Sequence, residues 1–337
     1  MYKVGKQSIR LENAPCILSS AAIGGKREGE GPLRSYFDYL GQDTKLSQPT
    51  WEKAESKLQE LALDTARRKA GLQDADLDVL FAGDLLNQCI SSTFAVRDTH
   101  IPFLGLYGAC STMAESLLLA ACAINAGYAE KAAALTSSHF ASAERQYRFP
   151  LGYGGQRTPT AQWTVTGAGC CILGADGPGP YVTAATVGTV EDLGIRDANN
   201  MGAAMAPAAV ATLNAHFDDL GLSPQDYDLI VTGDLGSLGH RIVSEEFQRQ
   251  KLPLGSRYQD CGMLIYDPET QDVHAGGSGC GCSASVLCGY LLQQLRTGKL
   301  HSLLFCATGA LLSPVSTWQG ESIPCICHAV ALHGERR

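Results

Sequence analysis

Cys110 is the residue of this sequence best placed to carry out chemistry. It follows an apolar strand pattern and a Gly-Ala turn, and it precedes a long helix pattern that opens with small residues. At a helix N-terminus, backbone N–H groups and the helix dipole favour negative charge, which lowers the pKa of a thiol. The same N–H groups also suit a bound carboxylate. We therefore predict a nucleophile or an anion site at Cys110, the alternative being a small core residue on a strand-to-helix turn.

The other cysteines have the residue type of metal ligands but not the spacing. Cys280-x-Cys282 and Cys325-x-Cys327-His328 lack the two-residue gap of zinc knuckles. Alternate residues of a strand face the same side, so core packing is the simpler interpretation. The thirteen cysteines are an odd number, and several lie in apolar runs such as residues 169–173. This distribution indicates reduced, buried thiols, and we expect no metal site.

The composition is that of an acidic globular chain. The 337 residues include 26 Lys+Arg and 34 Asp+Glu, which gives a net charge of −8, and 45% are hydrophobic. The absence of basic runs excludes a nucleic-acid binder. The longest apolar run lies within residues 117–124 and is too short for a membrane span, and residues 1–11 lack the apolar stretch of an export signal. We expect a chain made in the cytosol that does not cross a membrane.

An internal repeat organises the chain. The segment 77–85 returns as 227–235, at an offset of 150 residues, and each copy reads as a helix ending in glycine, an acidic turn and a strand closing on Gly-Asp. The helix pattern 112–126 with its following strand returns at 283–297, at an offset of 171 residues. Because helices alternate with short strands in both copies, we predict an α/β pseudo-dimer.

The two halves meet at the Gly-Pro-Gly-Pro stretch 177–180, the clearest breaker cluster in the chain. We therefore place an N-terminal half carrying Cys110 at residues 1–177 and a C-terminal half at residues 178–337. Asp84 and Asp234 end the two repeated strands. They are either site residues or helix caps, and we favour capping.

The two-lobed repeat with Gly-Ala-Cys-Ser at residues 108–111 resembles the thiolase and ketoacyl-synthase superfamily over nearly the whole chain. The resemblance implies a duplicated, five-layered αβαβα fold and an acyl-carrying cysteine at Cys110. The loop 276–285 resembles the one that bears a His or Asn in that superfamily, a position that Cys280 occupies here. Residues 306–309 resemble its C-terminal Cys-x-Gly turn.

This chain also departs from the superfamily pattern at the second histidine position. Alignment places Gly236 there, and His240 is nearby but out of register. Acyl transfer needs a base to activate the cysteine and donors to hold the developing oxyanion. His139, His240 or His328 could supply the base if the fold brought one of them near Cys110. Otherwise these departures indicate an enzyme fold that has lost its catalysis.

At a finer level the chain closely resembles the stage V sporulation protein AD family from end to end. The segments that carry this resemblance are 14–16, 82–88, 108–112, 136–140, 144–150, 156–169 and 276–285. The resemblance implies a sporulation protein that binds dipicolinic acid (pyridine-2,6-dicarboxylate) and works with the SpoVA membrane proteins in its uptake into the developing spore. It also implies a location at the spore inner membrane, held there peripherally, and a role in release at germination.

A site for dipicolinate needs an apolar slot for the ring and a donor group for each carboxylate. The Cys110 turn supplies the first, and the arginine-rich segment 143–157 offers the second, since arginine binds carboxylates in a bidentate manner. The alternative for that segment is a solvated, charged loop. The ligand-binding residues that we predict are Cys110, Ser111, His139, Arg145, Arg148 and Cys280.

Two alternatives remain open at this stage. One is an acyltransferase or thioesterase that uses Cys110 on acyl-CoA or an acyl carrier protein, and the other is a structural adaptor of the membrane complex that binds no ligand. Only the first would use coenzyme A. No other cofactor is expected, although Ca²⁺ could accompany the ligand. The superfamily resemblance also implies a homodimer.

Overall fold

The computed structural model describes residues 1–147 and 157–336 of the chain. In this part of the chain, two sheets of equivalent strand order are joined into one 13-stranded hydrogen-bonded network, which includes three small strands beside the main path. The strands of the first sheet, in spatial order, are β3 (Cys16–Gly24), β9 (Gly167–Gly174), β7 (Lys131–Ser138), β5 (Val79–Gly83) and β6 (Phe103–Gly105). Those of the second are β10 (Tyr181–Thr186), β15 (Cys325–His333), β14 (Ser302–Ala310), β11 (Leu229–Thr232) and β12 (Tyr258–Asp260).

The two sheets are related strand by strand. In each sheet the first two neighbouring pairs are antiparallel and the last two are parallel. The duplication predicted from the sequence is therefore present in the topology. The sheets meet at the pair Tyr181↔Cys16 of β10 and β3. The smaller strands are β1 (Tyr2–Val4), β2 (Ser8–Arg10) and β4 (Tyr39–Leu40), and β8 (Trp163–Thr164) pairs separately with β13 (Gly277–Ser278).

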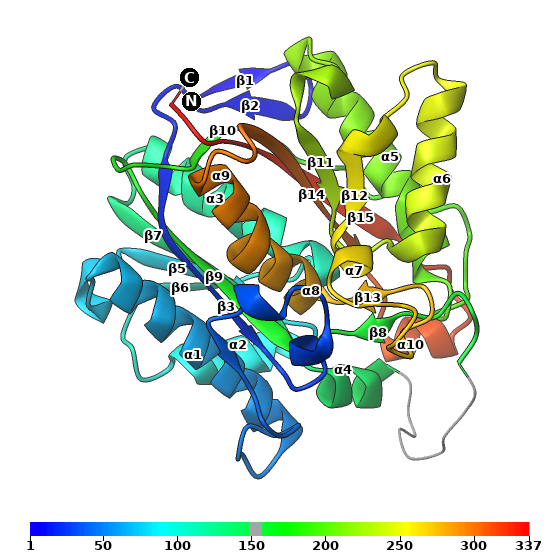
Figure 1. Cartoon of the computed structure of the whole chain (residues 1–337), viewed down its shortest axis with the longest axis horizontal. Coiled ribbons are helices and arrows are strands. Elements are labelled where there is room, and N and C mark those ends of the chain that lie inside the picture. The colour runs from blue at the N-terminus through cyan, green and yellow to red at the C-terminus, as the bar shows by residue number, and fades with distance from the viewer. Residues whose placement is uncertain (148–156, 337) are drawn as a thin grey trace.

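Helices form three layers around the two sheets (Figure 1). On the outside of the first sheet lie α1 (Trp51–Ala70) and α2 (Ile90–Val96), and on the outside of the second lie α5 (Met201–Leu220) and α6 (Gly236–Arg249). Between the sheets lie α3 (Thr112–Asn125) and the continuous run α8 (Cys280–Ser285), η9 (Val286–Leu291) and α9 (Leu292–Arg296). The predicted five-layered αβαβα arrangement is confirmed.

The sequence features that specify the helices are visible in the structure. The central α3 is buried on nearly all sides, as its almost uninterrupted apolar sequence predicts. The outer α1 begins at Thr50, whose hydroxyl accepts a hydrogen bond from the Lys53 N–H, and ends at Gly71 in the left-handed conformation. Its counterpart α5 ends in the same way at Gly221. The paired Gly-Leu sequences of the repeat are thus two equivalent helix ends.

The remaining short elements lie near the strand ends. They are α4 (Phe140–Tyr147), α7 (Cys261–Leu264), α10 (Pro314–Trp318) and the 3₁₀ turns, including η1 (Glu28–Glu30) and η5 (Ala109–Ser111). None of the helices in the part of the chain that the structure describes is long and apolar enough to cross a bilayer. All thirteen cysteines are free, and only Cys110 and Cys122 are partly exposed.

Candidate functional site: the Cys110 pocket

Cys110 lines a narrow pocket between the two halves of the chain. The first half contributes the η5 turn and α4, and the second half contributes the start of α5, β13 and the end of β14. Most of the described lining residues are apolar. They are Leu85, Ala109, Cys110, Ala143, Glu144, Tyr147, Thr164, Ala198, Met201, Met205, Ser278, Ala310 and Leu312. The pocket thus has the apolar walls and few polar groups of a small-molecule site.

The position of Cys110 depends on a strained turn. Ala109 adopts φ +50°, in the left-handed region that residues with a Cβ rarely occupy, and η5 then runs directly into α3. The turn packs closely on β14, because a Cβ on Gly309 would lie 3.3 Å from the Cys110 nitrogen and 2.2 Å from the Gly108 oxygen. The predicted strand-to-helix position of Cys110 is confirmed, and the Cys-x-Gly-like segment lies beside it.

The prediction that the helix N-terminus lowers the pKa of Cys110 is wrong. Burial raises the pKa of its thiol well above the ordinary value, and the nearby Asp234 carboxyl and Cys280 raise it further. The helix N-terminus does not offset these effects. Cys110 is therefore held as a neutral thiol at pH 7 rather than as a reactive thiolate.

Asp234 lies next to Cys110, although the sequence analysis favoured a role for it as a helix cap. Its carboxylate accepts hydrogen bonds from the Gly279 N–H at 2.8 Å, the Thr308 hydroxyl at 3.0 Å and the Ser278 hydroxyl at 3.2 Å. The Cys110 thiol also lies close enough to Asp234 for the two groups to interact electrostatically. Burial raises the pKa of Asp234 to about 7. Asp234 therefore connects the cysteine turn of one half to the loop before α8 of the other.

Asp84, the repeat counterpart of Asp234, does act as a helix cap. Its carboxylate accepts hydrogen bonds from the Ser92 N–H at 2.8 Å, in the first turn of α2, and from the Leu86 N–H at 2.9 Å. The capping interpretation is thus confirmed for Asp84 and incomplete for Asp234.

Two of the predicted binding residues lie beside the pocket without lining it. Ser111 is fully buried, and its hydroxyl donates to the Gly108 carbonyl at 2.7 Å within the turn. Cys280 is also fully buried, and its thiol donates to the Ser137 carbonyl at 2.9 Å. The pocket side of that loop is formed by Ser278 instead. Ser111 and Cys280 support the walls of the pocket.

His139 lies outside the Cys110 pocket and is a satisfied structural residue. Its Nδ1 accepts from the Ala141 N–H at 3.1 Å, so the ring proton is on Nε2, which donates to the Thr44 carbonyl at 2.7 Å. Burial lowers the pKa of His139. This histidine is neutral and faces a different groove, beside Trp163 and Arg27.

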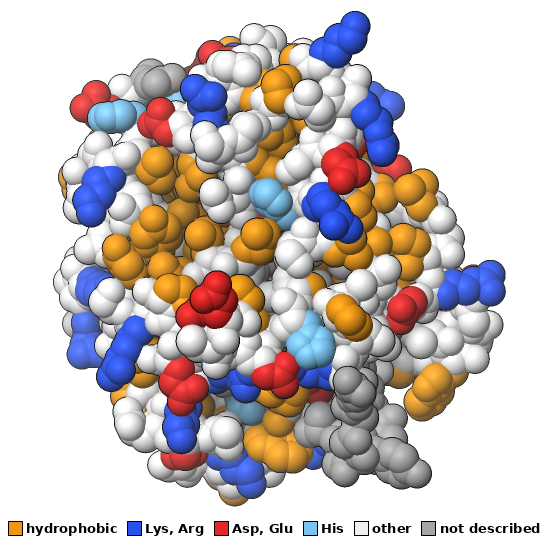
Figure 2. Space-filling model, turned by 45° about the vertical axis from the view of Figure 1, so that its right-hand side comes forward, with side chains coloured by type: hydrophobic (Ala, Val, Ile, Leu, Met, Phe, Trp, Pro, Cys, Tyr) orange, Lys and Arg blue, Asp and Glu red, His pale blue; other side chains and the backbone are white. Residues whose placement is uncertain are grey.

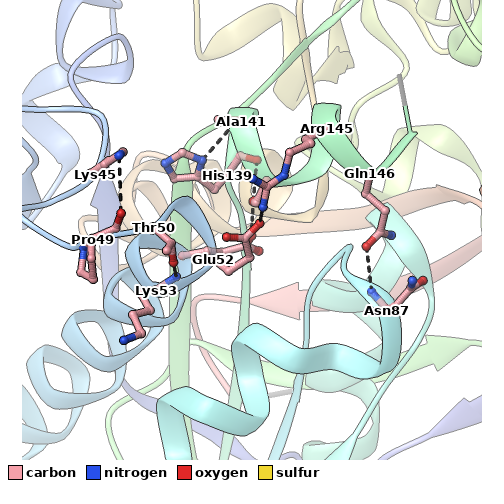
Figure 3. A network of polar contacts seen from close by, with 12 residues as sticks. Lys45, Pro49, Thr50, Glu52, Lys53, Asn87, His139, Ala141, Arg145 and Gln146 are labelled. Atoms are coloured by element: carbon pink, nitrogen blue, oxygen red, sulfur yellow. Dashed lines mark hydrogen bonds and ion pairs between the residues drawn. The ribbon is translucent and has the colours of Figure 1, made fainter. Parts of the chain in front are cut away.

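Arg145 also points away from the pocket (Figure 3). It projects from α4 towards α1, where its guanidinium forms an ion pair with Glu52 and lies 5.3 Å from the centre of the Trp51 ring. Its neighbour Gln146 accepts a hydrogen bond from the Asn87 N–H at 3.1 Å. The structure therefore does not place Arg145 where it could bind a ligand held at Cys110. Arg148 lies outside the described residues.

Neither His240 nor His328 takes the place of a catalytic base. The His240 ring stacks on Tyr258 at 4.3 Å, and its Nε2 lies 3.3 Å from the Tyr258 carbonyl. The Nδ1 of His328 accepts from the Gly188 N–H, and burial lowers its pKa to about 4. Gly236 has no room for a side chain, because a Cβ there would lie 2.5 Å from the Ala275 oxygen. No histidine is among the described residues that line the Cys110 pocket.

The polar groups that do line the pocket are largely engaged with one another. The Thr164 hydroxyl donates to Glu144 at 2.9 Å, and the Tyr147 hydroxyl donates to the Leu85 carbonyl at 2.6 Å. No lysine or arginine belongs to the described lining. Among the described residues, no three metal-ligating side chains gather as a metal site would require.

Several residues at the pocket could not be recognised as site residues from the sequence. Met201 and Met205 have the spacing of any buried helix face, and they line the same pocket as Cys110 because the start of α5 borders it. Glu144 was visible only as part of a charged segment. Asp234 did carry a signal, the repeated Gly-Asp strand end, which also fitted a cap.

Known proteins resemble this chain at two levels. A family model described as Stage V sporulation protein AD (SpoVAD) matches residues 5–333. The Stage V sporulation protein AD of Bacillus subtilis (strain 168) is 46% identical over 330 residues, which cover 98% of this chain and 97% of the relative.

Solved structures that resemble the chain share its fold at low identity. A variant of OleA from Xanthomonas campestris has a TM-score of 0.62 at 12% identity, over 96% of this chain and 100% of that one. The 3-oxoacyl-[acyl-carrier-protein] synthase III of Aquifex aeolicus VF5 has a TM-score of 0.58 at 13% identity, over 95% of this chain and 100% of that one. Human mitochondrial 3-ketoacyl-CoA thiolase in complex with CoA has a TM-score of 0.58 at 12% identity, over 96% of this chain and 99% of that one. These likenesses show a thiolase-like fold, and the match along the sequence shows that the chain belongs to the stage V sporulation protein AD family.

Proposed function

We propose that this sporulation protein binds dipicolinic acid in the Cys110 pocket and does not catalyse acyl transfer. One observation carries the proposal: Cys110 keeps its place at the base of an apolar pocket, but its thiol is neutral and no histidine lines that pocket among the described residues. Such a site favours holding a small molecule over attacking one. Leu85, Met201 and Met205 supply apolar surface for a ring.

The proposal is tested by calorimetric titration of the purified protein with dipicolinate, with and without Ca²⁺, in parallel with acetyl-CoA. We expect saturable binding of dipicolinate and no acyl-enzyme. Cys110→Ala should weaken the binding, because it changes the shape and polarity of the pocket floor. Cys122→Ala is a matched control, since Cys122 is the other partly exposed cysteine and does not line the pocket.

The two rival functions predict other outcomes. Acyl-enzyme formation on Cys110 without dipicolinate binding would identify an acyltransferase or thioesterase. On the face that Figure 2 shows, lysine and arginine side chains are scattered among acidic ones rather than gathered as an entrance for the phosphates of coenzyme A would require. Binding of neither compound would leave the adaptor function and refute the proposal.

The proposed role extends to the SpoVA membrane proteins, with which the protein would act at the spore inner membrane during uptake of dipicolinic acid and its release at germination. Membership of the family supports this part of the proposal. Its test is co-purification of the protein with solubilised spore inner membrane. Recovery only in the fraction without membrane proteins would contradict it.

The proposal also includes a homodimer that pairs along β6. This strand ends the first sheet and pairs with β5 alone in the described topology. Leu104 within it and Tyr107 just after it are 51% and 47% exposed. An unpaired strand edge with exposed apolar side chains is a common interface for a second copy. Light scattering should give the dimer mass, and Leu104→Glu should shift it towards the monomer. A wild-type monomer would refute this part of the proposal.

A further inference from the structure

Two segments that border the Cys110 pocket carry an exposed apolar surface. Residues 187–198 follow β10, and residues 311–322 connect β14 to β15 through α10, which lies at the lower right edge of the molecule in Figure 1. Trp318 and Leu193 have the largest exposed fractions of the large apolar side chains in the described part of the chain, 82% and 73%. We define the α10 patch as the large apolar side chains of these segments that are more than half exposed, namely Val190, Leu193, Val315 and Trp318.

The two segments are held side by side by hydrogen bonds. The backbones of Glu191 and Cys325 exchange two hydrogen bonds of 2.8 Å. The Ser322 hydroxyl donates to the Asp192 carboxylate at 2.6 Å. These contacts fix the loop that carries Leu193 against the chain that follows α10. The patch is therefore a single surface built from both segments.

The segments that carry the α10 patch are acidic. Together they contain one arginine, no lysine or histidine, and four carboxyl side chains, which are those of Glu191, Asp192, Asp197 and Glu321. Hydrogen bonds from the Ser322 hydroxyl and the Gly194 N–H hold the pKa of Asp192 below its usual range, so this carboxyl is ionised at neutral pH. The patch thus combines exposed apolar side chains with a net negative charge.

This charge argues against two of the occupants that an exposed apolar surface can have. A bilayer rich in anionic lipids attracts basic surfaces and repels an acidic one. A second copy of the chain, paired about a two-fold axis, would bring the same carboxyls face to face. A partner segment with basic and apolar side chains complements both the charge and the apolar surface of the patch.

Resting on the proposed role beside membrane proteins, we propose that the α10 patch binds a basic segment of a membrane protein, with Trp318 and Leu193 as the apolar anchors. Membrane proteins are rich in lysine and arginine in the short loops that face the cytoplasm. Exposed tryptophan is typical of the residues that contribute most to protein interfaces. Because Ala198 and Leu312 of the same two segments line the Cys110 pocket, the bound partner would lie beside the ligand site.

The proposal is tested in sporulating cells whose full-length protein carries the photo-crosslinker p-benzoylphenylalanine at the position of Trp318. Mass spectrometry identifies the attached peptide and the protein from which it comes. We expect a peptide of a membrane protein that is rich in lysine and arginine. The same probe at Tyr128 is the matched control, because this side chain is 70% exposed and lies outside the patch. It should not capture that peptide.

Charge reversal tests the electrostatic part of the proposal. With the probe at Trp318, the combination of Asp197→Lys and Glu321→Lys should lower the yield of the crosslink by about tenfold, because the new charges repel a basic partner. Asp98→Lys is the control, since the Asp98 side chain is 89% exposed and lies outside the two segments. It should leave the yield unchanged. An undiminished yield after charge reversal at the patch would overturn the assignment of a basic partner.

The other outcomes separate this inference from the proposed function. A crosslink from Trp318 to lipid, to a second copy of the chain or to a soluble protein would overturn the inference, and so would the absence of any crosslink. Calorimetry on the purified charge-reversal variant should give the wild-type affinity for dipicolinate, because neither Asp197 nor Glu321 lines the pocket. Failure of the wild type to bind dipicolinate would refute the proposed function and leave the crosslink at the patch standing.

Discussion

The two strand-to-helix turns of the repeat are built in opposite ways. In the first half, Cys110 carries a side chain and faces Gly309 of β14. In the second half, the same offset places Gly281 at the position of Cys110, and it faces Ser138 of β7. The Gly281 N–H donates to the Ser138 hydroxyl at 3.1 Å, and that hydroxyl donates to the Val165 carbonyl. One turn thus opens onto a pocket while the other is closed by packing.

The paired aspartates differ in the same way. Asp84 is used within its own half, as the cap of α2, whereas Asp234 reaches across to the cysteine turn of the other half. Duplication supplied two equivalent turns and two equivalent carboxyls. The difference between them leaves one turn open to a pocket and the other enclosed by packing.

The largest expected effect on stability comes from a substitution that disrupts the closed turn at Gly281. A Cβ on Gly281 would lie 2.5 Å from the Gly167 oxygen and 2.7 Å from the Ser138 nitrogen, so the backbone would have to move. We expect Gly281→Ala to lower the free energy of unfolding by about 4 kcal/mol or more. Cys110→Ala at the equivalent position should change it little. Urea denaturation compares the two variants, and equal losses would contradict the contrast between the turns.

The next effect concerns the stability conferred by Asp234. Because its pKa in the folded protein, about 7, lies above the ordinary carboxyl value, the folded state binds the proton more tightly than the unfolded chain does. The stabilisation from this proton is complete below about pH 4 and is lost as the pH rises to about 7, an amount on the order of 3 kcal/mol.

Asp234→Asn should remove this part of the pH dependence. Urea denaturation at pH 4.5 and pH 7.5 measures it, and the loss between the two values should be smaller in the variant than in the wild type. Asp98→Asn serves as the control, because the Asp98 side chain is 89% exposed. An unchanged pH dependence in Asp234→Asn would show that this carboxyl titrates normally in the folded protein.

A smaller effect concerns the reactivity of Cys110. Since burial and Asp234 raise the pKa of its thiol well above the ordinary value, iodoacetamide should alkylate it slowly at pH 7 and faster only as the pH approaches alkaline values. Mass spectrometry of the Cys110 peptide follows the rate, and Cys122 gives an internal comparison. Rapid alkylation at pH 6 to 7 would indicate a thiolate and support the acyltransferase.

The smallest effect is expected from Arg145→Ala. Arg145 pairs with Glu52 on the outer side of α4, where its charge is partly exposed and the pair contributes little. We expect dipicolinate affinity to change less than twofold, at low and at high salt alike. A loss of affinity that high salt reduces would instead place the second carboxylate of the ligand near this arginine.

The fold was predictable because its signals repeat. The strand closing on Gly-Asp, the helix ending at Gly71 and again at Gly221, and the largely apolar α3 each follow from local chemistry, and each has a counterpart in the other half. The position of Cys110 on its turn follows from the same pattern. These features depend on neighbours in the sequence, which the sequence shows directly.

The electrostatics of the site were not predictable in the same way. A helix N-terminus favours a thiolate, but burial raises the pKa of Cys110, and Asp234 and Cys280 of the other half of the chain raise it further. Arg145 and His139 have the residue types of a carboxylate site. However, Arg145 projects from α4 to Glu52, and His139, after the end of β7, is hydrogen-bonded to Thr44. Such partners become visible only when the two sheets are packed together.

The most direct test of the central claim is a crystal structure of the protein with bound dipicolinate. Our account predicts the pyridine ring in the Cys110 pocket, with Met201 and Met205 on one side and a carboxylate within hydrogen-bonding distance of Ser278. Dipicolinate bound at another place on the chain, with the Cys110 pocket empty, would contradict the account.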